Sequence, residues 1–182
     1  MDQNIGNVGD NAEVQNSAEF SENYVLETIG LTKTYSRKNV VNNLNMKIRK
    51  GDIYGFIGKN GAGKTTTIKM ITGMISPSSG SIKLFGKEKL SDSRKKIGCI
   101  IENPAFYPYM SAHDNIEAQR LLKGVKDKSI TNELLEIVGL KNVGKKKLKN
   151  FSLGMKQRLA IALALVGDPE ILLLDEPING LD

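Results

Sequence analysis

Hydrophobic and polar positions along the chain follow two different spacings, and each spacing predicts a kind of element. Apolar residues alternate with polar ones over Val25–Thr32 and Leu44–Ile48, which is typical of strands with one buried face. Short, mainly apolar runs bounded by turn residues predict four more strands: Ile53–Gly58, Ser81–Phe85, Lys96–Ile101 and Glu170–Leu174.

Apolar residues three or four positions apart predict helices between these strands. The expected helices cover Thr65–Met74, Ser111–Lys123, Ile130–Val138 and Ser152–Val166. Two of them carry a start signal, because Ser111 is followed three residues later by Asp114 and Ser152 is a favoured N-terminal capping residue. Strands separated by helices predict an α/β fold with a largely parallel sheet.

The first 23 residues differ from the rest in composition. They are rich in Asn, Gln, Ser, Glu and Gly and have no apolar period, which predicts a disordered tail over residues 1–23. Up to Tyr24 the chain holds five acidic residues and no Lys or Arg, so the remaining sequence holds 26 basic and 15 acidic residues. This surplus suits nucleic acid, an anionic membrane surface, a polyphosphate ligand or a solvated basic face, and charge alone does not choose among them.

Several classes of protein are excluded by the same composition. One cysteine excludes a disulfide framework, and one histidine excludes most histidine-built metal sites. No run approaches the ~18–20 apolar residues of a membrane-spanning helix. The first ten residues have neither the basic nor the apolar region of a secretion signal, so the cytoplasm is the expected location.

A glycine-rich loop lies between an expected strand and an expected helix. The segment GKNGAGKTT matches the phosphate-binding pattern G-x-x-x-x-G-K-[ST] at Gly58, Gly63, Lys64 and Thr65. Glycines let backbone N–H groups surround phosphate oxygens, a lysine at this place reaches the β- and γ-phosphates, and the hydroxyl that follows can ligate Mg²⁺. The expected nucleotide-binding residues of the loop are Gly58, Asn60, Gly61, Ala62, Gly63, Lys64, Thr65 and Thr66.

Two acidic residues end the last expected strand, in the segment ILLLDEP. Carboxylates at the end of a buried strand are costly unless a cation or a ligand compensates them. Asp175 suits a role toward Mg²⁺, and Glu176 suits a base that orients the attacking water. Taken with the phosphate-binding loop, these acids predict a nucleoside triphosphatase.

Four motifs in order resemble one family. From about Val25 to Asp182 the chain resembles the nucleotide-binding domain of an ABC transporter: GKNGAGKTT its Walker A, FSLGMKQR its signature, LLLDEP its Walker B and NGLD its D-loop. The resemblance implies a P-loop NTPase core with an N-terminal antiparallel β subdomain over 24–101 and a helical subdomain over about 102–150. The signature helix, Walker B and D-loop then occupy 151–182. Phe151, Leu153 and Met155 depart from the commonest signature, as in a familiar variant, while Ser152 and Gly154 remain.

The resemblance assigns further binding residues, each with a plainer alternative. Tyr35 lies where an aromatic ring stacks on adenine, or it is a half-buried tyrosine at a strand end. Ser152 and Gly154 lie where the signature contacts the γ-phosphate held by a second subunit, so the site is completed in a homodimer or heterodimer. An ordinary N-terminal cap is the alternative for Ser152, and both functions are compatible because they use the same donors.

Glu102 occupies a place where most ABC proteins have a glutamine that senses metal, water and γ-phosphate. A glutamate there resembles the subgroup that exports bacitracin or protects against lantibiotics, and it is expected to act in catalysis and toward the metal. The alternative is a plain loop carboxylate. The aromatic segment Phe106–Tyr109 resembles the surface that receives a coupling helix of a membrane subunit, or it packs into the core.

The resemblance implies the cytoplasmic ATP-binding and ATP-hydrolysing subunit of an exporter for a peptide antibiotic. Lys64, Glu102 and Glu176 are the expected catalytic residues, and Thr65, Asp175 and Glu102 the expected Mg²⁺ ligands. Separate permease subunits would hold it at the inner face of the membrane, and no nucleic acid is expected. The alternatives are a soluble ABC ATPase acting on ribosomes or DNA, and an ATP-binding fragment without turnover.

Completeness is a further expectation. In the family a switch histidine follows some thirty residues beyond the D-loop, and His113 precedes the signature and cannot replace it. The family also places a further strand between the Walker A and Walker B strands. The sequence therefore predicts a fragment of a longer subunit, with negligible ATPase activity and poor solubility alone, and a gap between Ile53–Ile57 and Ile171–Leu174.

Overall fold

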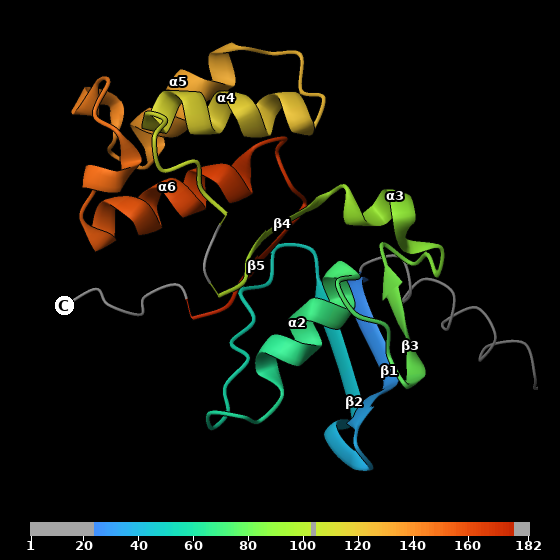
Figure 1. Ribbon diagram of the computed structural model, residues 1–182. Helices are drawn as coiled ribbons and strands as arrows, with labels where there is room; N and C mark the ends of the chain where they lie inside the picture. The colour runs from blue at the N-terminus through green and yellow to red at the C-terminus, as the bar shows by residue number, and fades with distance from the viewer. Residues whose placement is uncertain (1–23, 103–104, 177–182) are drawn as a thin grey trace, which may run out of the picture.

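The computed structural model describes residues 24–102 and 105–176 (Figure 1). A β part and a helical part lie at opposite ends of the molecule, and two short strands lie between them (Figure 1). The expected tail, residues 1–23, and the expected D-loop, residues 179–182, fall outside the described residues.

The β part is an antiparallel sheet of three strands, β1 (Tyr24–Tyr35), β2 (Lys38–Arg49) and β3 (Ser79–Leu84), in the order β2-β1-β3. Alternate side chains face one side of the sheet, because successive residues of a strand point to opposite faces. The buried ones include Leu26, Leu31, Met46 and Leu84. This is the antiparallel subdomain that the family resemblance implied.

Helix α2 (Lys64–Thr72) covers the buried face of that sheet (Figure 1). Its apolar positions Met70 and Ile71 join the same core. The short helix α3 (Leu90–Arg94), which the sequence pattern did not predict, holds the end of α2, because Arg94 donates hydrogen bonds to the carbonyl oxygens of Ile71 at 3.1 Å and Met70 at 3.3 Å. Basic side chains at this end of a helix satisfy its last carbonyl groups.

Strands β4 (Ile97–Ile100) and β5 (Ile171–Leu174) form a parallel pair with Ile97 opposite Ile171 and Ile100 opposite Leu174. Both expected strands are therefore confirmed, shortened by one or two residues. Gly98 allows α6 to approach closely, because a Cβ atom there would collide with the carbonyl oxygen of Ala164. The carboxyl ends of the two strands lie side by side, since the Asp175 backbone N–H donates to the Ile100 carbonyl at 2.9 Å.

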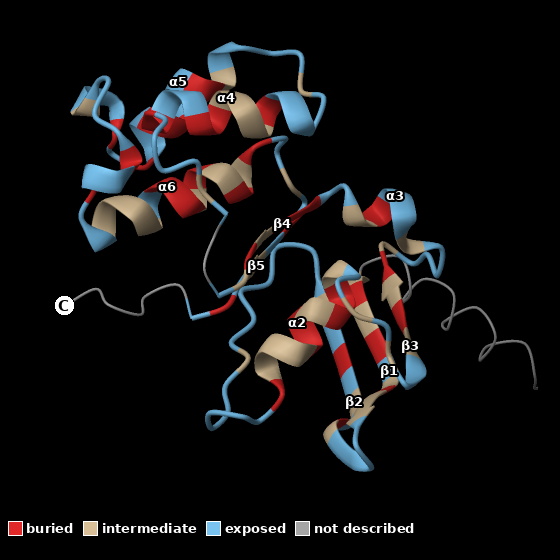
Figure 2. Cartoon of the chain, viewed as in Figure 1, coloured by how far each residue is buried: buried red, intermediate tan, exposed pale blue. Residues whose placement is uncertain are grey.

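The helical part consists of α4 (Ala112–Leu122), α5 (Ser129–Ile137) and α6 (Leu153–Leu165), with 3₁₀ turns at Lys141–Val143 and Leu148–Asn150. Their buried positions face one another (Figure 2). The two start signals are confirmed: Ser111 and Asp114 form a capping box on α4, and the Ser152 hydroxyl accepts a hydrogen bond from the Met155 N–H at 3.3 Å.

The expected strand Ile53–Gly58 is wrong. These residues form no strand, and the side chains of Ile53 and Ile57 are almost fully exposed. A strand needs a hydrogen-bonding neighbour, and β4 and β5 pair only with each other within residues 24–102 and 105–176. The predicted gap is present, because this segment and β5 do not pair and both line a cavity of about 1090 Å³.

Candidate functional site

The glycine-rich loop enters α2 through Gly63, which has a left-handed backbone (φ 90°) and stands at the N-cap of the helix. A Cβ atom at Gly63 would lie 2.6 Å from the Val40 carbonyl oxygen and 2.9 Å from a Val41 methyl group. Both the torsion angle and the contact therefore require glycine. Strand β2 thus fixes the loop at its junction with the helix, where the first N–H groups of α2 can bind an anion.

Lys64 returns over the loop that precedes it. Its ammonium donates to the carbonyl oxygens of Gly58 at 2.7 Å and of Lys59 at 3.2 Å. These contacts keep the cation at the mouth of the loop, where phosphate oxygens would compete with the carbonyl groups for it. The geometry suits the expected role of Lys64 toward phosphate.

Thr65 and Asp175, which are 110 residues apart, meet in the structure. The Thr65 hydroxyl donates a hydrogen bond to Asp175 Oδ2 at 2.6 Å. Asp175 is 8% exposed, and its position follows from the pairing of β4 with β5. The structure thus brings the phosphate-binding loop and the end of the last strand together, as the sequence analysis expected.

A hydroxyl and a carboxylate oxygen are hard donors that suit Mg²⁺, which keeps several water molecules and binds few protein groups beside a nucleotide. The contact between Thr65 and Asp175 therefore fits this ion. No cluster of three or more His, Cys, Asp or Glu side chains that could hold a metal is present among residues 24–102 and 105–176.

Glu176 follows Asp175 and is exposed, with a left-handed backbone (φ 48°) that is uncommon for glutamate. It lines the same cavity as Lys64 and Asp175. Glu176 is thus near the phosphate-binding loop, and its role as the base stays a prediction.

Glu102 lies two residues beyond β4 and also has a left-handed backbone (φ 55°). Its carboxylate oxygen Oε1 is 2.7 Å from the ammonium nitrogen of Lys69 on α2. The expected metal and catalytic roles of Glu102 stay predictions, and the structure adds a cationic partner that was not assigned from the sequence. In the sequence, Lys69 could be linked to the site only through its spacing. It is four residues after Thr65 and therefore on the same face of α2.

Tyr35 stands at the end of β1, beside the turn that leads into β2. Its side chain is 47% exposed, and the Lys33 ammonium lies 5.1 Å from the centre of its ring. Lys33 is paired with Val41, the residue that contacts Gly63. The ring is therefore accessible, as stacking on a base requires, and stacking stays a prediction.

Ser152 and Gly154 are not brought to the loop. They lie at the start of α6, in the helical part, and neither lines the cavity that Lys64 and Asp175 line. The alternative for Ser152, an N-terminal cap, is confirmed. Contact of the signature with a phosphate stays a prediction.

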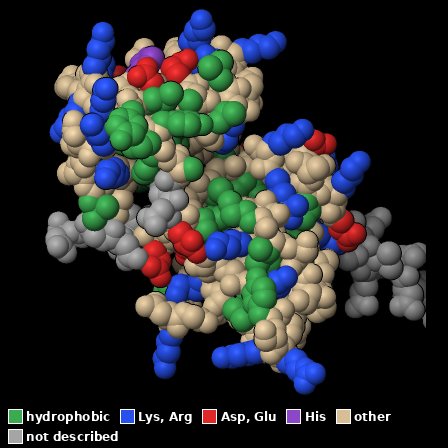
Figure 3. Space-filling model, viewed as in Figure 1, with side chains coloured by type: hydrophobic (Ala, Val, Ile, Leu, Met, Phe, Trp, Pro, Cys, Tyr) green, Lys and Arg blue, Asp and Glu red, His purple; other side chains and the backbone are tan. Residues whose placement is uncertain are grey.

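The cavity beside the loop is a long apolar trough. Its lining includes Gly58 and Lys64, the 53–57 segment and β5. Hydrophobic side chains are visible on the surface in the middle of the molecule, between the helical part and the β part (Figure 3). Most of the lining of this cavity is too apolar for a triphosphate. The part of the cavity lined by Lys64 and Asp175 suits the phosphates of a nucleotide.

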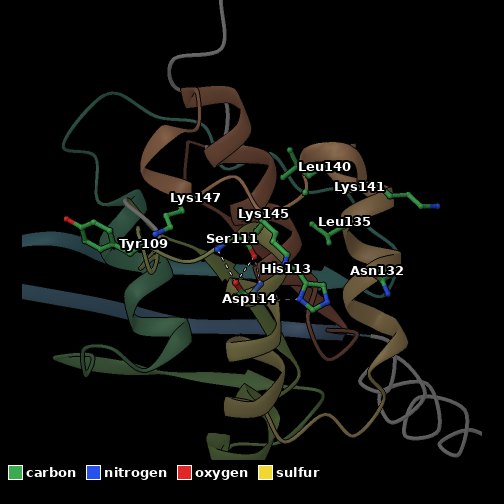
Figure 4. Close-up of a pocket in the computed structure, with 12 residues that line it drawn as sticks. Tyr109, Ser111, His113, Asp114, Asn132, Leu135, Leu140, Lys141, Lys145 and Lys147 are labelled. Carbon is green, nitrogen blue, oxygen red and sulfur yellow. Dashed lines mark hydrogen bonds and ion pairs between the residues drawn. The ribbon is translucent and has the colours of Figure 1, made fainter.

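A second cavity, of about 480 Å³, lies in the helical part (Figure 4). Lys141, Lys145 and Lys147 contribute positive charge, and Tyr109 is at its rim, 71% exposed. The Ser111 hydroxyl and the Asp114 carboxylate meet at 2.7 Å inside their capping box. The donors at the start of α4 are therefore satisfied, and the cavity offers a basic and aromatic surface.

The aromatic segment after Glu102 divides between the two readings. Tyr107 and Tyr109 are exposed, at 49% and 71%, whereas Phe106 packs partly against the core of the helical part. Lys149 lies over the Tyr109 ring at 5.1 Å. Core packing therefore holds in part for Phe106, and contact of the exposed tyrosines with a coupling helix stays a prediction.

Comparison with known proteins identifies the class of this site. The sequence pattern that defines the ABC transporter family matches residues 41–179, and the chain belongs to that family. The bacitracin transport ATP-binding protein BcrA of Bacillus licheniformis is 48% identical over 161 residues, covering 87% of this chain and 53% of BcrA. The lantibiotic transport ATP-binding protein SrtF of Streptococcus pyogenes is 48% identical over 158 residues, covering 87% of this chain and 69% of SrtF.

Solved structures agree with this assignment. A putative ABC transporter ATP-binding protein from Pyrococcus furiosus has a TM-score of 0.76 and 34% identity, covering 86% of this chain and 78% of that one. The family and the P-loop NTPase fold, both expected from the motifs, are confirmed.

The chain spans about half the length of its bacitracin-transport relative. None of its described helices is long and apolar enough to cross a membrane.

Proposed function

We propose that this chain is the ATP-binding and ATP-hydrolysing part of an ABC exporter for a peptide antibiotic. The observation that carries the proposal is the hydrogen bond between Thr65 and Asp175, because it joins the phosphate-binding loop to the acidic end of the last strand. Both residues are of the types that hold Mg²⁺ beside a nucleotide.

Each residue of the site has a separate role in ATP binding or hydrolysis. The loop N–H groups and the Lys64 ammonium bind the β- and γ-phosphates, and the exposed Tyr35 ring receives the base. Thr65 and Asp175 would hold Mg²⁺, which when bound offsets negative charge on the phosphates. Glu176 orients a water molecule for attack on the γ-phosphate and accepts its proton.

A second copy or a related subunit supplies the signature. Ser152 and Gly154 lie at the N-terminus of α6, away from the loop of their own chain, and such a helix end suits an anion. We therefore infer that ATP is sandwiched between the loop of one subunit and the signature of another, and that hydrolysis separates the two.

Permease subunits are the proposed membrane partner. Tyr107, Tyr109 and the nearby lysines form an exposed aromatic and basic surface on the helical part. Aromatic side chains are enriched where proteins bind one another. Contact through this surface would place the chain at the cytoplasmic face of the membrane, where basic residues also face anionic lipid.

The long trough would be covered in the intact protein. Ile53 is fully exposed beside β5, whose outer edge has no partner strand among the described residues. We propose that a further strand of the same subunit fills the trough, as the family resemblance implied, and that residues 53–57 become a strand when it does.

The peptide substrate is proposed from the relatives alone, since one is named for bacitracin transport and the other for lantibiotic transport. The test is growth of the source cells with each antibiotic after deletion of the gene. Wild type should restore resistance to one of them, and Glu176→Gln should not. Lys95→Met, which changes one exposed lysine at the C-terminal end of α3, is the control and should restore it.

Unchanged resistance to both classes in the deletion strain would contradict the proposed substrate. Co-purification of the protein with ribosomes or DNA in place of membranes would contradict the exporter and favour the soluble ATPase.

A further inference from the structure

The carboxylate of Glu102 stands where negative charge is already concentrated. Asp175 and Glu176 lie at the adjacent strand end, since Ile100 pairs with Leu174 and its carbonyl accepts the Asp175 N–H. Under the proposed function, on which this inference rests, the phosphates of ATP come to the same edge. Like charges at close range destabilise one another, so a glutamate here needs compensation that a glutamine would not.

Helix α2 provides that compensation through two contacts one turn apart. Thr65 Oγ1 is 2.6 Å from Asp175 Oδ2 beyond β5, and Lys69 Nζ is 2.7 Å from Glu102 Oε1 beyond β4. Residues four apart share one face of a helix. The same face of α2 therefore contacts the carboxyl ends of both parallel strands.

The ion pair is poorly placed to stabilise the fold. The Lys69 and Glu102 side chains are 31% and 61% exposed, and exposed pairs contribute little to the free energy of folding. Glu102 also adopts a left-handed backbone that costs free energy for a residue with a side chain. A structural role therefore does not account for the pair.

We propose that Lys69 is a positioning residue for Glu102. Its ammonium neutralises the carboxylate and holds it against α2, so that a glutamate can stand beside the triphosphate of ATP. In this role Lys69 matters because Glu102 is charged, and not because Lys69 itself binds the nucleotide.

A double-mutant cycle in the intact protein tests this dependence. Affinity is measured by titration with a fluorescent ATP analogue, both with Mg²⁺ and with EDTA, and kcat is measured separately. Lys69→Met should weaken binding about fivefold when residue 102 is glutamate, and less than about twofold in the Glu102→Gln background. Lys69→Arg should keep affinity near that of wild type, because it keeps the charge.

Lys95→Met is the control for a general loss of positive charge, since Lys95 pairs with Asp92 on α3, and it should leave affinity unchanged. Equal weakening of ATP binding by Lys69→Met in both backgrounds would show direct attraction of the nucleotide by Lys69 and overturn the inference. Unchanged ATP affinity in both backgrounds would also overturn it. A wild-type protein that binds no ATP would instead overturn the proposed function, and the inference with it.

Discussion

Gly63, Lys64 and Thr65 are consecutive, and each is fixed by a different part of the molecule. The Val40 carbonyl leaves no room for a Cβ atom at Gly63, the carbonyl oxygens of Gly58 and Lys59 hold Lys64, and Asp175 holds Thr65. The loop is therefore organised before a nucleotide arrives, which reduces the entropy lost on binding.

Lys64→Ala removes the cation that the loop holds at its mouth. We expect MgATP affinity to fall at least about tenfold, or about 1.4 kcal/mol, because Lys64 is the charge that the loop is expected to direct at the terminal phosphates. Isothermal titration with ATP and ADP measures the effect, and Tyr35→Ala is the matched variant. That second change should weaken binding of ATP and ADP equally, since the ring is proposed to stack on the base, which the two nucleotides share. Unchanged affinity in both variants would refute the site.

The site residues that could be predicted from the sequence are those that belong to a short continuous segment. The glycines, Lys64 and Thr65 form one continuous motif, and Asp175 follows an apolar run that must be buried. Lys69 could not be assigned as the partner of Glu102, because their contact depends on how α2 packs against β4, across 33 residues of sequence.

At the scale of elements, a network of polar side chains holds α4 against α5. Arg120 is buried and donates to the Glu117 carboxylate at 2.9–3.1 Å, and the buried Thr131 of α5 donates to the same carboxylate. The guanidinium hydrogen bonds, followed by that of Thr131, lower the pKa of Glu117 from 4.5 to about 2. The charged form is thus stabilised by folding.

Glu117→Gln should destabilise the protein by about 1–2 kcal/mol at neutral pH, because it removes charged hydrogen bonds from a buried guanidinium. A lowered pKa means that the contribution is complete above pH 4.5 and is lost as the pH falls toward about 2. Urea unfolding at several pH values measures it. Glu136→Gln, which removes an exposed pair with Lys141, is the control and should show little loss. A pH-independent loss would contradict the account of this network.

The helices were predicted better than the strands for a physical reason. Helix starts depend on neighbours in sequence, and both capping residues, Ser111 and Ser152, act as predicted. The segment Ile53–Gly58 has the composition of a strand, but pairing depends on a partner distant in sequence, and the described residues provide none. The five-residue helix α3 has no strong periodicity to reveal it.

At the scale of the whole molecule, the two parts carry the two motifs that the proposed function assigns to ATP binding. The phosphate-binding loop belongs to the β part and the signature to the helical part, with β4 and β5 between them (Figure 1). Glu102 lies two residues beyond β4, and its carboxylate pairs with Lys69 of α2. Motif order predicted this division, but the sequence alone could not predict the direction in which each motif faces.

The central claim is that the site hydrolyses ATP through Glu176, and phosphate release by the intact protein tests it most directly. Turnover is measured at saturating MgATP for wild type and Glu176→Gln, with ATP affinity measured on the same samples. We expect steady turnover for wild type, and for the variant unchanged affinity within about twofold with turnover reduced about a hundredfold. Equal turnover in the two proteins, or none in wild type that binds ATP, would contradict the account.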